Sequence, residues 1–308
     1  MGNSPCACHS FFAFQRYGGD ASRQLSNPRD CPLDSDGVAL RRDPKQDIET
    51  LTETDKDSRA HKGWAFAHLA FIVSALVALY LVLVMMATHL GYVSEDLGFK
   101  TLTLNYGPKL VVAALVVSGL SLLISLFLSP GRRAFWALAA VVLAGSMMGG
   151  FYAYQKALRA FPPIADVATD WDRPLSFSDK LMADRGPDAL PVEDLPRVPR
   201  NESMEWGGKT IADINDATCP GARTVMNKAV TEDQIVSILQ QEHYVIFGHA
   251  PWRVEASYQD SFYGFRSDVV VRIDPRTIDV RSISRHDVPD LGGNCRRVTR
   301  IVQKIRGL

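Results

Sequence analysis

The residues best placed for chemistry lie between 278 and 297, in the segment IDVRSISRHDVPDLGGNCRR. Side chains alternate between the two faces of a strand, so Arg281 and Arg285 share one face, roughly 13 Å apart at about 3.3 Å per residue. Asp268 and Arg272 share a face of the preceding strand-like segment in the same way. Guanidinium groups in such a row either bind an anion or form ion pairs with carboxylates of their own domain. The sequence leaves both interpretations open.

The structural interpretation is a ladder of charges across a sheet and its loops. Antiparallel pairing would bring Asp268 close to one arginine, with Arg272 on the same face. Asp290 would return from the following turn to the other arginine. In this interpretation Asp268, Arg272 and Asp290 are structural charge partners.

The functional interpretation is an anion site. Arg281 and Arg285 would bind a phosphate or carboxylate, and the Gly-Gly-Asn turn at 292–294 would offer backbone N–H groups at the start of a helix. Asn294 is expected to be the N-cap of that helix in either interpretation. The candidate binding residues are Arg281, Arg285, Asn294 and Arg297.

A catalytic interpretation would use Ser284, His286 and Asp290 as the nucleophile, base and orienting group of a hydrolase. These residues are close in sequence, but no nucleophile-elbow pattern surrounds them. The histidines and cysteines lack the spacing of a metal site, so the sequence predicts no metal and no cofactor. It also lacks a nucleic-acid-binding motif. An enzyme is therefore the less favoured interpretation.

A folded domain must position these residues. Residues 231–242 begin with the capping-box pattern of Thr231 and Gln234, which predicts a helix. Four strand-like segments follow, and 294–308 place an apolar stripe at helical spacing. The order predicts an α+β domain of a helix, a four-stranded antiparallel meander and a helix, with both helices on one face of the sheet. The strands are expected at 244–250, 253–260, 264–274 and 277–285.

The last predicted helix has a basic edge. Arg296, Arg300 and Lys304 recur at every fourth position. The simplest interpretation is a solvated helix face. The alternative is attraction to anionic lipid headgroups, at about 1 kcal/mol per basic residue near a membrane surface.

Three apolar runs precede this domain, at 64–90, 109–128 and 134–155, and their one charged residue is Lys109 at the first position of the second run. Each is long enough to cross the hydrocarbon layer of about 30 Å, which predicts three membrane spans. Because no charged residue interrupts them, we expect an anchor and not a transport pathway. Gly145 and Gly149 in the third span form a small-residue pair that would permit a homo-oligomer.

Lysines and arginines near the span ends set the expected orientation, because cytoplasmic loops are enriched in them. Five against four favours a cytoplasmic N-terminus and an extracytoplasmic C-terminal domain. That compartment would allow Cys219 and Cys295 to pair, although two free thiols are an equal alternative. The five are Lys56, Arg59, Lys62, Arg132 and Arg133, and the four are Lys100, Lys109, Lys156 and Arg159.

Four regions are expected along the chain. A disordered tail covers 1–62, where hydrophobic periodicity is absent, and the three spans cover 63–156. A proline-rich strap at 157–220 belongs to the C-terminal domain, and the α+β fold itself covers 221–308.

Three segments together resemble the domain of unknown function 1499 family: FPPIADVATD, FYGFRSDVVVRI and IDVRSISRHDVPDLGGNCRRV. The resemblance covers about residues 161–308, half of the chain. Bacterial members often carry this domain after a few spans, which implies a multi-pass protein of the bacterial inner membrane with a periplasmic C-terminal domain. Ser267 departs from the family pattern, which has an aspartate there. The matching positions are Pro162, Pro163, Ile164, Asp166, Thr169, Asp170, Phe265, Asp268, Arg272, Asp279, Arg281, Ser282, Ser284, Arg285, Asp290, Leu291, Gly292 and Asn294.

The family label implies no activity. The sequence therefore predicts an integral membrane protein of unknown biochemical function, whose extracytoplasmic domain is a binding or scaffold module. Its expected partners are the lipid bilayer and an envelope protein or an anionic lipid or glycan group. A membrane-anchored, hydrolase-like enzyme is the alternative.

Overall fold

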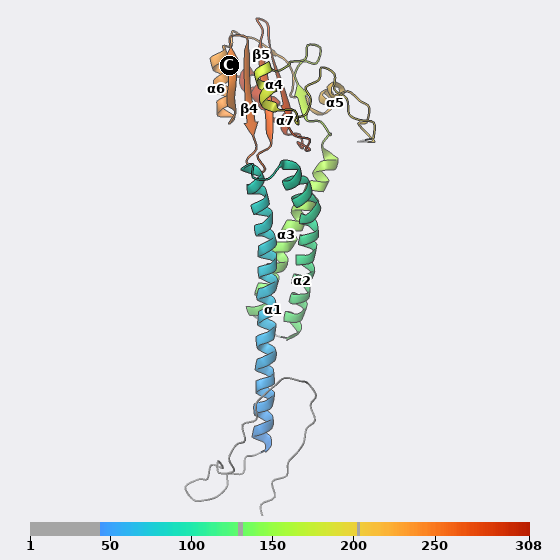
Figure 1. Ribbon diagram of the computed structural model, residues 1–308, viewed down its shortest axis with the longest axis vertical. Coiled ribbons are helices and arrows are strands. Elements are labelled where there is room, and N and C mark those ends of the chain that lie inside the picture. The colour runs from blue at the N-terminus through green and yellow to red at the C-terminus, as the bar shows by residue number, and fades with distance from the viewer. Residues whose placement is uncertain (1–43, 129–131, 202–203) are drawn as a thin grey trace, which may run out of the picture. The chain divides into compact units, whose positions relative to one another are not determined.

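The computed structural model describes residues 44–128, 132–201 and 204–308 (Figure 1). The chain divides into two compact units, Met1–Asp57 and Ser58–Leu308, and the second contains the apolar helices and the C-terminal domain. The disorder predicted for residues 1–43 lies outside the described residues.

Among the described residues, three helices are long and apolar enough to cross a membrane, as the sequence predicts. They cover Phe66–His89, Asp96–Phe127 and Ala134–Ala160. The secondary-structure elements that form them are α1 (Pro44–His89), the π-helical segment η1 (Asp96–Tyr106), α2 (Gly107–Leu128) and α3 (Arg132–Ala160).

Two of these helices begin earlier than predicted. Helix α1 starts at Pro44, a residue type tolerated in the first helical turn, and no glycine or proline interrupts residues 45–62. The part of the tail from 44 to 62 is therefore helical in the structure. The second apolar helix starts at Asp96 instead of residue 109, because η1 continues into α2 with helical dihedral angles at Gly107.

The C-terminal domain contains one antiparallel sheet. The predicted four-stranded meander is present as β3 to β6, but the prediction was incomplete, because two short strands pair with the other side of β6. The sheet order is β1-β6-β5-β4-β3, with β2 also paired to β6. The strands are β1 (Asp166–Ala168), β2 (Val225–Met226), β3 (Val245–Ala250), β4 (Arg253–Gln259), β5 (Arg266–Ile273) and β6 (Thr277–Ser284).

Both predicted helices of this domain are present. Helix α6 (Glu232–Gln241) begins with the capping box of Thr231 and Gln234. Helix α7 (Gly293–Arg306) buries its apolar stripe, including Val298 and Ile301, against the sheet. Two further helices, α4 (Asp179–Arg185) and α5 (Ile211–Thr218), lie in the segment that was predicted as a strap.

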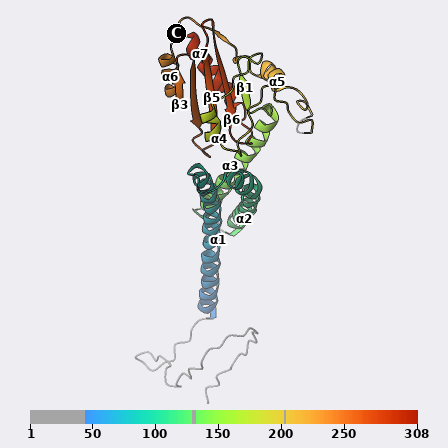
Figure 2. The same ribbon diagram turned by 45° about the horizontal axis from the view of Figure 1, so that its top comes forward.

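The sheet is covered on both faces. Helices α6 and α7 cover one face, and the larger hydrophobic core lies between them and the strands (Figure 2). On the other face, Leu181 of α4 packs with Leu175 and Phe177 over Val270 and Ile283. The strap residues are thus a third layer, and that layer faces the charged side of β5 and β6.

Cys219 and Cys295 form a disulfide, with their Cα atoms 5.7 Å apart. It joins the C-cap of α5 to the first turn of α7. The bond settles the alternative that the sequence left open in favour of pairing.

Candidate functional site

Arg281 lies inside the domain, on the face of β6 that the strap covers. Its side chain is 0% exposed and forms two bonds with the Asp166 carboxylate, Nε to Oδ1 at 3.0 Å and Nη2 to Oδ2 at 2.6 Å. It also donates to the carbonyl oxygens of Leu175 at 2.7 Å and Glu193 at 2.6 Å. The guanidinium lies 5.2 Å from the centre of the Trp171 ring. All three nitrogens of Arg281 therefore have acceptors within the domain.

Asp268 holds two arginines at the same time. Arg285 donates Nε and Nη2 to its two carboxylate oxygens, each at 2.8 Å, and Arg185 of α4 donates Nη1 at 2.5 Å. The hydroxyl of Ser257 donates to the same carboxylate. Burial lowers the pKa of Arg185, and the charge of Asp268 opposes that shift. Arg285 completes its bonds on Asp184, at the backbone oxygen and the carboxylate.

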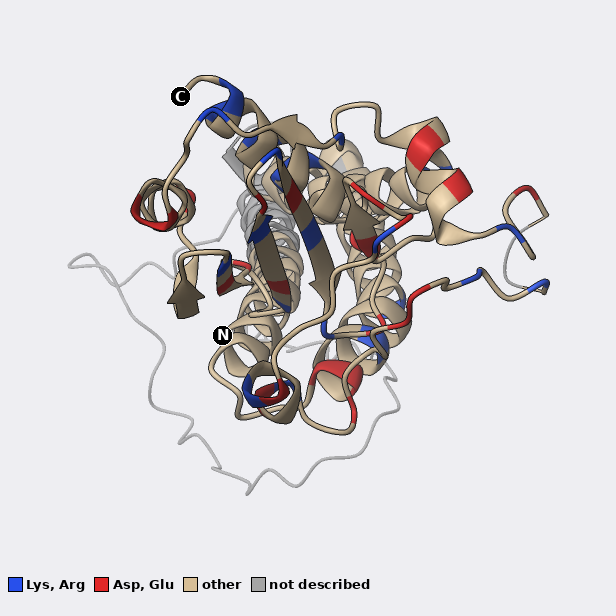
Figure 3. Ribbon diagram, turned by 90° about the horizontal axis from the view of Figure 1, so that it is seen from above, with Lys and Arg blue, Asp and Glu red and all other residues tan. Residues whose placement is uncertain are grey.

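Arg272 continues this row of charges on β5. It donates to Asp170 at 3.1 Å and to Asp279 at 2.8 Å. Asp279 is fully buried and also accepts from Thr224 at 2.6 Å. Figure 3 shows acidic and basic residues following one another along the central strands. The contacts on this face are those of the charge ladder.

Asp290 and Asn294 have different roles from those expected. Asp290 accepts the backbone N–H groups of Gly292 at 2.9 Å and Asn294 at 2.7 Å, so it supports the start of α7 instead of pairing with an arginine of β6. The N-cap is Gly292, at a φ of 73°, so the N-cap prediction for Asn294 was wrong. A left-handed turn places Asn294 inside the helix, where its side-chain amide bonds with Ser282 and Ser284.

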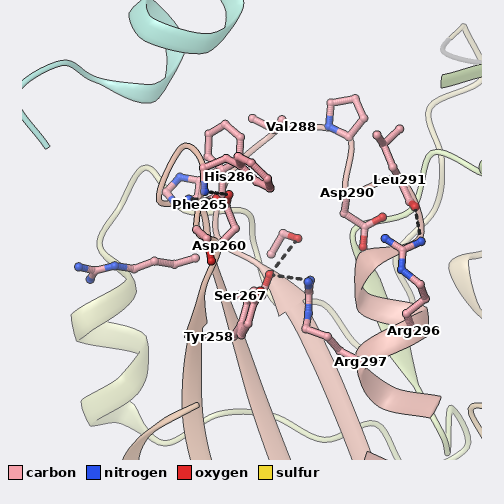
Figure 4. A pocket seen from close by; sticks show the side chains of 15 residues that line it. Tyr258, Asp260, Phe265, Ser267, His286, Val288, Asp290, Leu291, Arg296 and Arg297 are labelled. Atoms are coloured by element: carbon pink, nitrogen blue, oxygen red, sulfur yellow. Dashed lines mark hydrogen bonds between the residues drawn. The ribbon is translucent and has the colours of Figure 1, made fainter. Parts of the chain in front are cut away.

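A cavity of about 450 Å³ lies where β5 begins and β6 ends (Figure 4). Its walls come from the turn at 260–265, the segment at 286–291 and the first turns of α7. One part of the lining is apolar or aromatic and includes Tyr258, Phe262, Phe265, Val288, Pro289 and Leu291. The basic part is Arg266, Arg296 and Arg297.

The arginines of this cavity have few partners. Arg297 donates Nη2 to Ser267 at 3.1 Å and to Asn294 at 2.8 Å, and it lies 4.9 Å from the Tyr258 ring centre. Its Nε is buried and finds no acceptor among the described residues. Arg296 is exposed and donates Nη1 to the carbonyl of Leu291 at 2.9 Å. In the described part of the chain, neither Arg296 nor Arg297 forms an ion pair with a carboxylate.

The acidic residues of the cavity bind backbone groups. Asp260 accepts from the N–H groups of Phe262 and Phe265, at 2.8 and 2.5 Å, and so shapes the turn. Burial raises the pKa of Asp290, while its bond from Asn294 and the charge of Arg297 act in the opposite direction. These carboxylates therefore stabilise the turns that line the cavity, and neither of them forms an ion pair with Arg296 or Arg297.

The catalytic interpretation requires Ser284, His286 and Asp290 to act together. Ser284 and His286 both line the cavity, but the Ser284 hydroxyl accepts from Asn294 at 2.9 Å, and His286 pairs through Nδ1 with Glu95. Asp290 is bound to backbone N–H groups. The observed bonds do not join these residues into a triad. No cluster of three potential metal ligands occurs among the described residues.

Sequence reasoning did not assign the strap residues that contact the arginines of β6. It assigned Asn294 and Arg297 of α7, but it did not place Arg296 at the cavity with its partner Leu291. Asp166 carries a signal, because it belongs to the quoted FPPIADVATD motif, whereas the others have no local pattern. The strap residues concerned are Asp166, Asp184, Arg185 and Glu193.

Residues 166–305 match the protein-family model described as "Protein of unknown function (DUF1499)". No curated protein and no solved structure matches the chain.

Proposed function

The C-terminal domain of this chain belongs to the DUF1499 family of proteins of unknown function, and from that premise we propose that the chain is a membrane-anchored binding module. Its ligand is an anionic group, held in the cavity beside Arg296 and Arg297. The observation that carries this proposal is that Arg297 has, among the described residues, neither a carboxylate partner nor an acceptor for its buried Nε. A buried donor of a charged group without a partner costs about 1–3 kcal/mol or more, and an oxygen of a bound anion would remove that cost.

The proposed anion site therefore uses only some of the residues that the sequence predicted for it. Arg281 and Arg285 already have protein acceptors, so their assignment as ligand-binding residues receives no support from their contacts. Arg297 belongs to the same predicted set and lines the cavity. Asn294 supports it by accepting one of its bonds at 2.8 Å.

We also propose that this domain lies outside the cytoplasm, in the periplasm of a bacterium whose inner membrane the helices span. The Cys219–Cys295 disulfide supports this side of the membrane, because such bonds persist in oxidising compartments. The excess of lysine and arginine on the N-terminal side agrees with it.

A scaffold role for an envelope protein, and a homo-oligomer through the third span, stay predictions. A side chain added at Gly145 or Gly149 would meet nothing within 4 Å, so this face of α3 is open to another helix.

A hydrolase-like enzyme is the second candidate function. It is not favoured, because Ser284 and His286 have other partners.

The proposal is tested by titrating inorganic phosphate into the full chain in nonionic detergent, with isothermal calorimetry as the measurement. We expect saturable binding that Arg297→Gln weakens about tenfold or more, since hydrogen bonds to charged groups contribute about 1.5–3 kcal/mol. Arg300→Gln is the matched control, because Arg300 lies on the same helix but pairs with Glu242 at 3.0 Å. Equal affinities for wild type and Arg297→Gln would contradict an anion site here.

A further inference from the structure

The ligand class of this cavity follows from its place next to the membrane helices. Residues at or next to the ends of the three apolar helices contact the cavity lining or its turn at 260–265. Gly264 lies so close to His89 that a Cβ added to the glycine would be 3.0 Å from the His89 carbonyl oxygen. The Phe265 and Phe99 ring centres are 5.2 Å apart. The Arg296 guanidinium lies 5.8 Å from the Phe161 ring centre.

These contacts place the cavity beside the ends of the three candidate spans. His89 ends the first candidate span, Phe99 lies near the start of the second, and Phe161 directly follows the third. The ends of membrane spans lie at the boundary between hydrocarbon and headgroups. A bond from the Tyr263 hydroxyl to Thr103, at 3.0 Å, connects the same turn to the second helix. If the three helices span a bilayer between these ends, the cavity lies at the level of its headgroups.

The lining suits a molecule with an anionic end and an apolar end. Arg296 and Arg297 lie on the α7 side, while Phe262, Val288 and Leu291 form much of the remaining wall. Phe262 is 66% exposed, so its ring is accessible to a ligand. The volume of about 450 Å³ falls within the range of about 300–1,000 Å³ typical of sites for organic ligands, which exceeds the need of one inorganic anion.

Exposed basic residues lie at the cavity and near the end of the third apolar helix. Lys156 and Arg159, in the last turns of α3, are exposed, as is Arg266 at the cavity. Each basic residue near a membrane surface attracts anionic lipid by about 1 kcal/mol. In contrast, Arg300 and Lys304, farther along α7, are paired with Glu242. The basic edge that the sequence places on α7 is thus free to attract anions only at its first residue, Arg296.

We propose that the anion is the phosphate headgroup of an anionic phospholipid, taken from the membrane that the chain itself spans. This inference rests on the proposed function and names its ligand class. The headgroup phosphate accepts from Arg296 and Arg297, and the glycerol and first acyl carbons lie against Phe262, Val288 and Leu291. A zwitterionic headgroup is disfavoured, because it would bring an ammonium group to the two arginines.

The test uses the full chain in nonionic detergent and native mass spectrometry, with phosphatidylglycerol and phosphatidylcholine added in parallel. We expect one phosphatidylglycerol per chain, bound about tenfold more tightly than phosphatidylcholine, because the ammonium group of phosphatidylcholine would lie close to two guanidinium groups. The double variant Arg296→Gln with Arg297→Gln should lose this preference. Arg300→Gln should keep it, and thermal unfolding of each variant verifies folding.

A second variant separates the lipid from a soluble anion. Phe262→Ser changes an exposed side chain, so the fold is not at risk. It should weaken phosphatidylglycerol several-fold and leave inorganic phosphate unchanged, because only the lipid contacts the apolar wall.

The outcomes distinguish the two proposals. Arginine-dependent phosphate binding with equal affinity for the two lipids would overturn the lipid inference and leave the anion site in place. The same holds if Phe262→Ser changes nothing. Lipid binding that does not respond to Arg296→Gln with Arg297→Gln would overturn the lipid inference, since lipids attracted by Lys156 and Arg159 alone would behave in that way. If phosphate binding does not respond either, both proposals are overturned.

Discussion

Arg281 and Arg297 belong to the same short motif region, but the structure surrounds them in opposite ways. Arg281 is fully buried, and each of its three nitrogens donates to a carboxylate or carbonyl oxygen of the domain. Arg297 lines a cavity, has no carboxylate partner in the described part of the chain, and keeps a buried Nε without an acceptor. Arg285, like Arg281, is paired with a carboxylate inside the domain. Arg296, like Arg297, lines the cavity without a carboxylate partner among the described residues.

The difference indicates which arginines are structural. Moving a guanidinium out of water is costly, and only complete pairing offsets that cost inside a domain. Arg281 and Arg285 satisfy this condition with residues of the strap, so they fasten the third layer to the sheet. Incomplete pairing at the edge of a cavity is instead what a binding site requires, because the ligand supplies the missing acceptor.

The largest effect on the free energy of unfolding should come from removing Arg281, whose three nitrogens all have acceptors. We expect Arg281→Leu to lower the free energy of unfolding by about 3–5 kcal/mol, because it leaves the Asp166 carboxylate buried without its partner. Burial already raises the pKa of Asp166, and the bonds from Arg281 counteract that shift. Unfolding of the full chain in nonionic detergent, followed by tryptophan fluorescence, measures the loss, since Trp171 lies beside Arg281.

A paired variant tests the cause of this loss. Arg281→Leu combined with Asp166→Leu removes both charges and should recover part of the stability. Recovery stays incomplete, because the carbonyls of Leu175 and Glu193 lose their donor. Arg276→Leu, at an exposed turn position, is the control and should change stability by less than about 0.5 kcal/mol. A loss below about 1 kcal/mol for Arg281→Leu would show that the buried ladder does not hold the strap.

A smaller effect on stability is expected for the cavity arginines. Arg297→Gln should cost about 1–2 kcal/mol, because it removes bonds to Ser267 and Asn294 but leaves no carboxylate unpaired. Arg296→Gln should cost less than about 1 kcal/mol, since its one bond is at the surface. The same unfolding measurement applies. If Arg297→Gln is as destabilising as Arg281→Leu, the distinction between structural and binding arginines fails.

The sequence predicted what depends on local pattern. Period-two alternation placed Arg281, Arg285 and Asp268 on one face of adjacent strands, and the antiparallel register of β5 and β6 brings Asp268 and Arg285 into contact. Uninterrupted apolar length predicted the spans, and the capping box predicted α6. In each case the signal lies within a few residues of the element that it specifies.

The remainder depends on contacts between distant segments. Asp166 reaches Arg281 from 115 residues away, on a strand of three residues that is too short to show alternation. The role of Asn294 depends on Ser282 and on a left-handed Gly292, which the Gly-Gly-Asn pattern alone does not distinguish from an N-cap. The cavity forms only when the turn at 260–265 meets the first turns of α7. Such packing has no periodic signature in the sequence.

The smallest effect on stability is expected for the surface ion pairs of Arg300 and Lys304 with Glu242. These residues are paired without being buried, so they test the contribution of pairing alone. Glu242 accepts from Lys304 and Arg300; burial acts to raise its pKa, but the bonds and charges of these two residues outweigh burial and lower it. Because the folded pKa lies below the unfolded value of about 4.3, the stabilisation is present above that pH and is lost as the pH falls through the folded pKa.

Glu242→Gln should therefore cost about 0.5–1 kcal/mol at pH 7, and the difference from wild type should shrink below about pH 4. Unfolding measured at both pH values, with Asp194→Asn as an exposed control, tests this. A cost that persists unchanged at low pH would mean that Glu242 acts through packing, and Arg300 would then be unsuitable as the paired reference for Arg297.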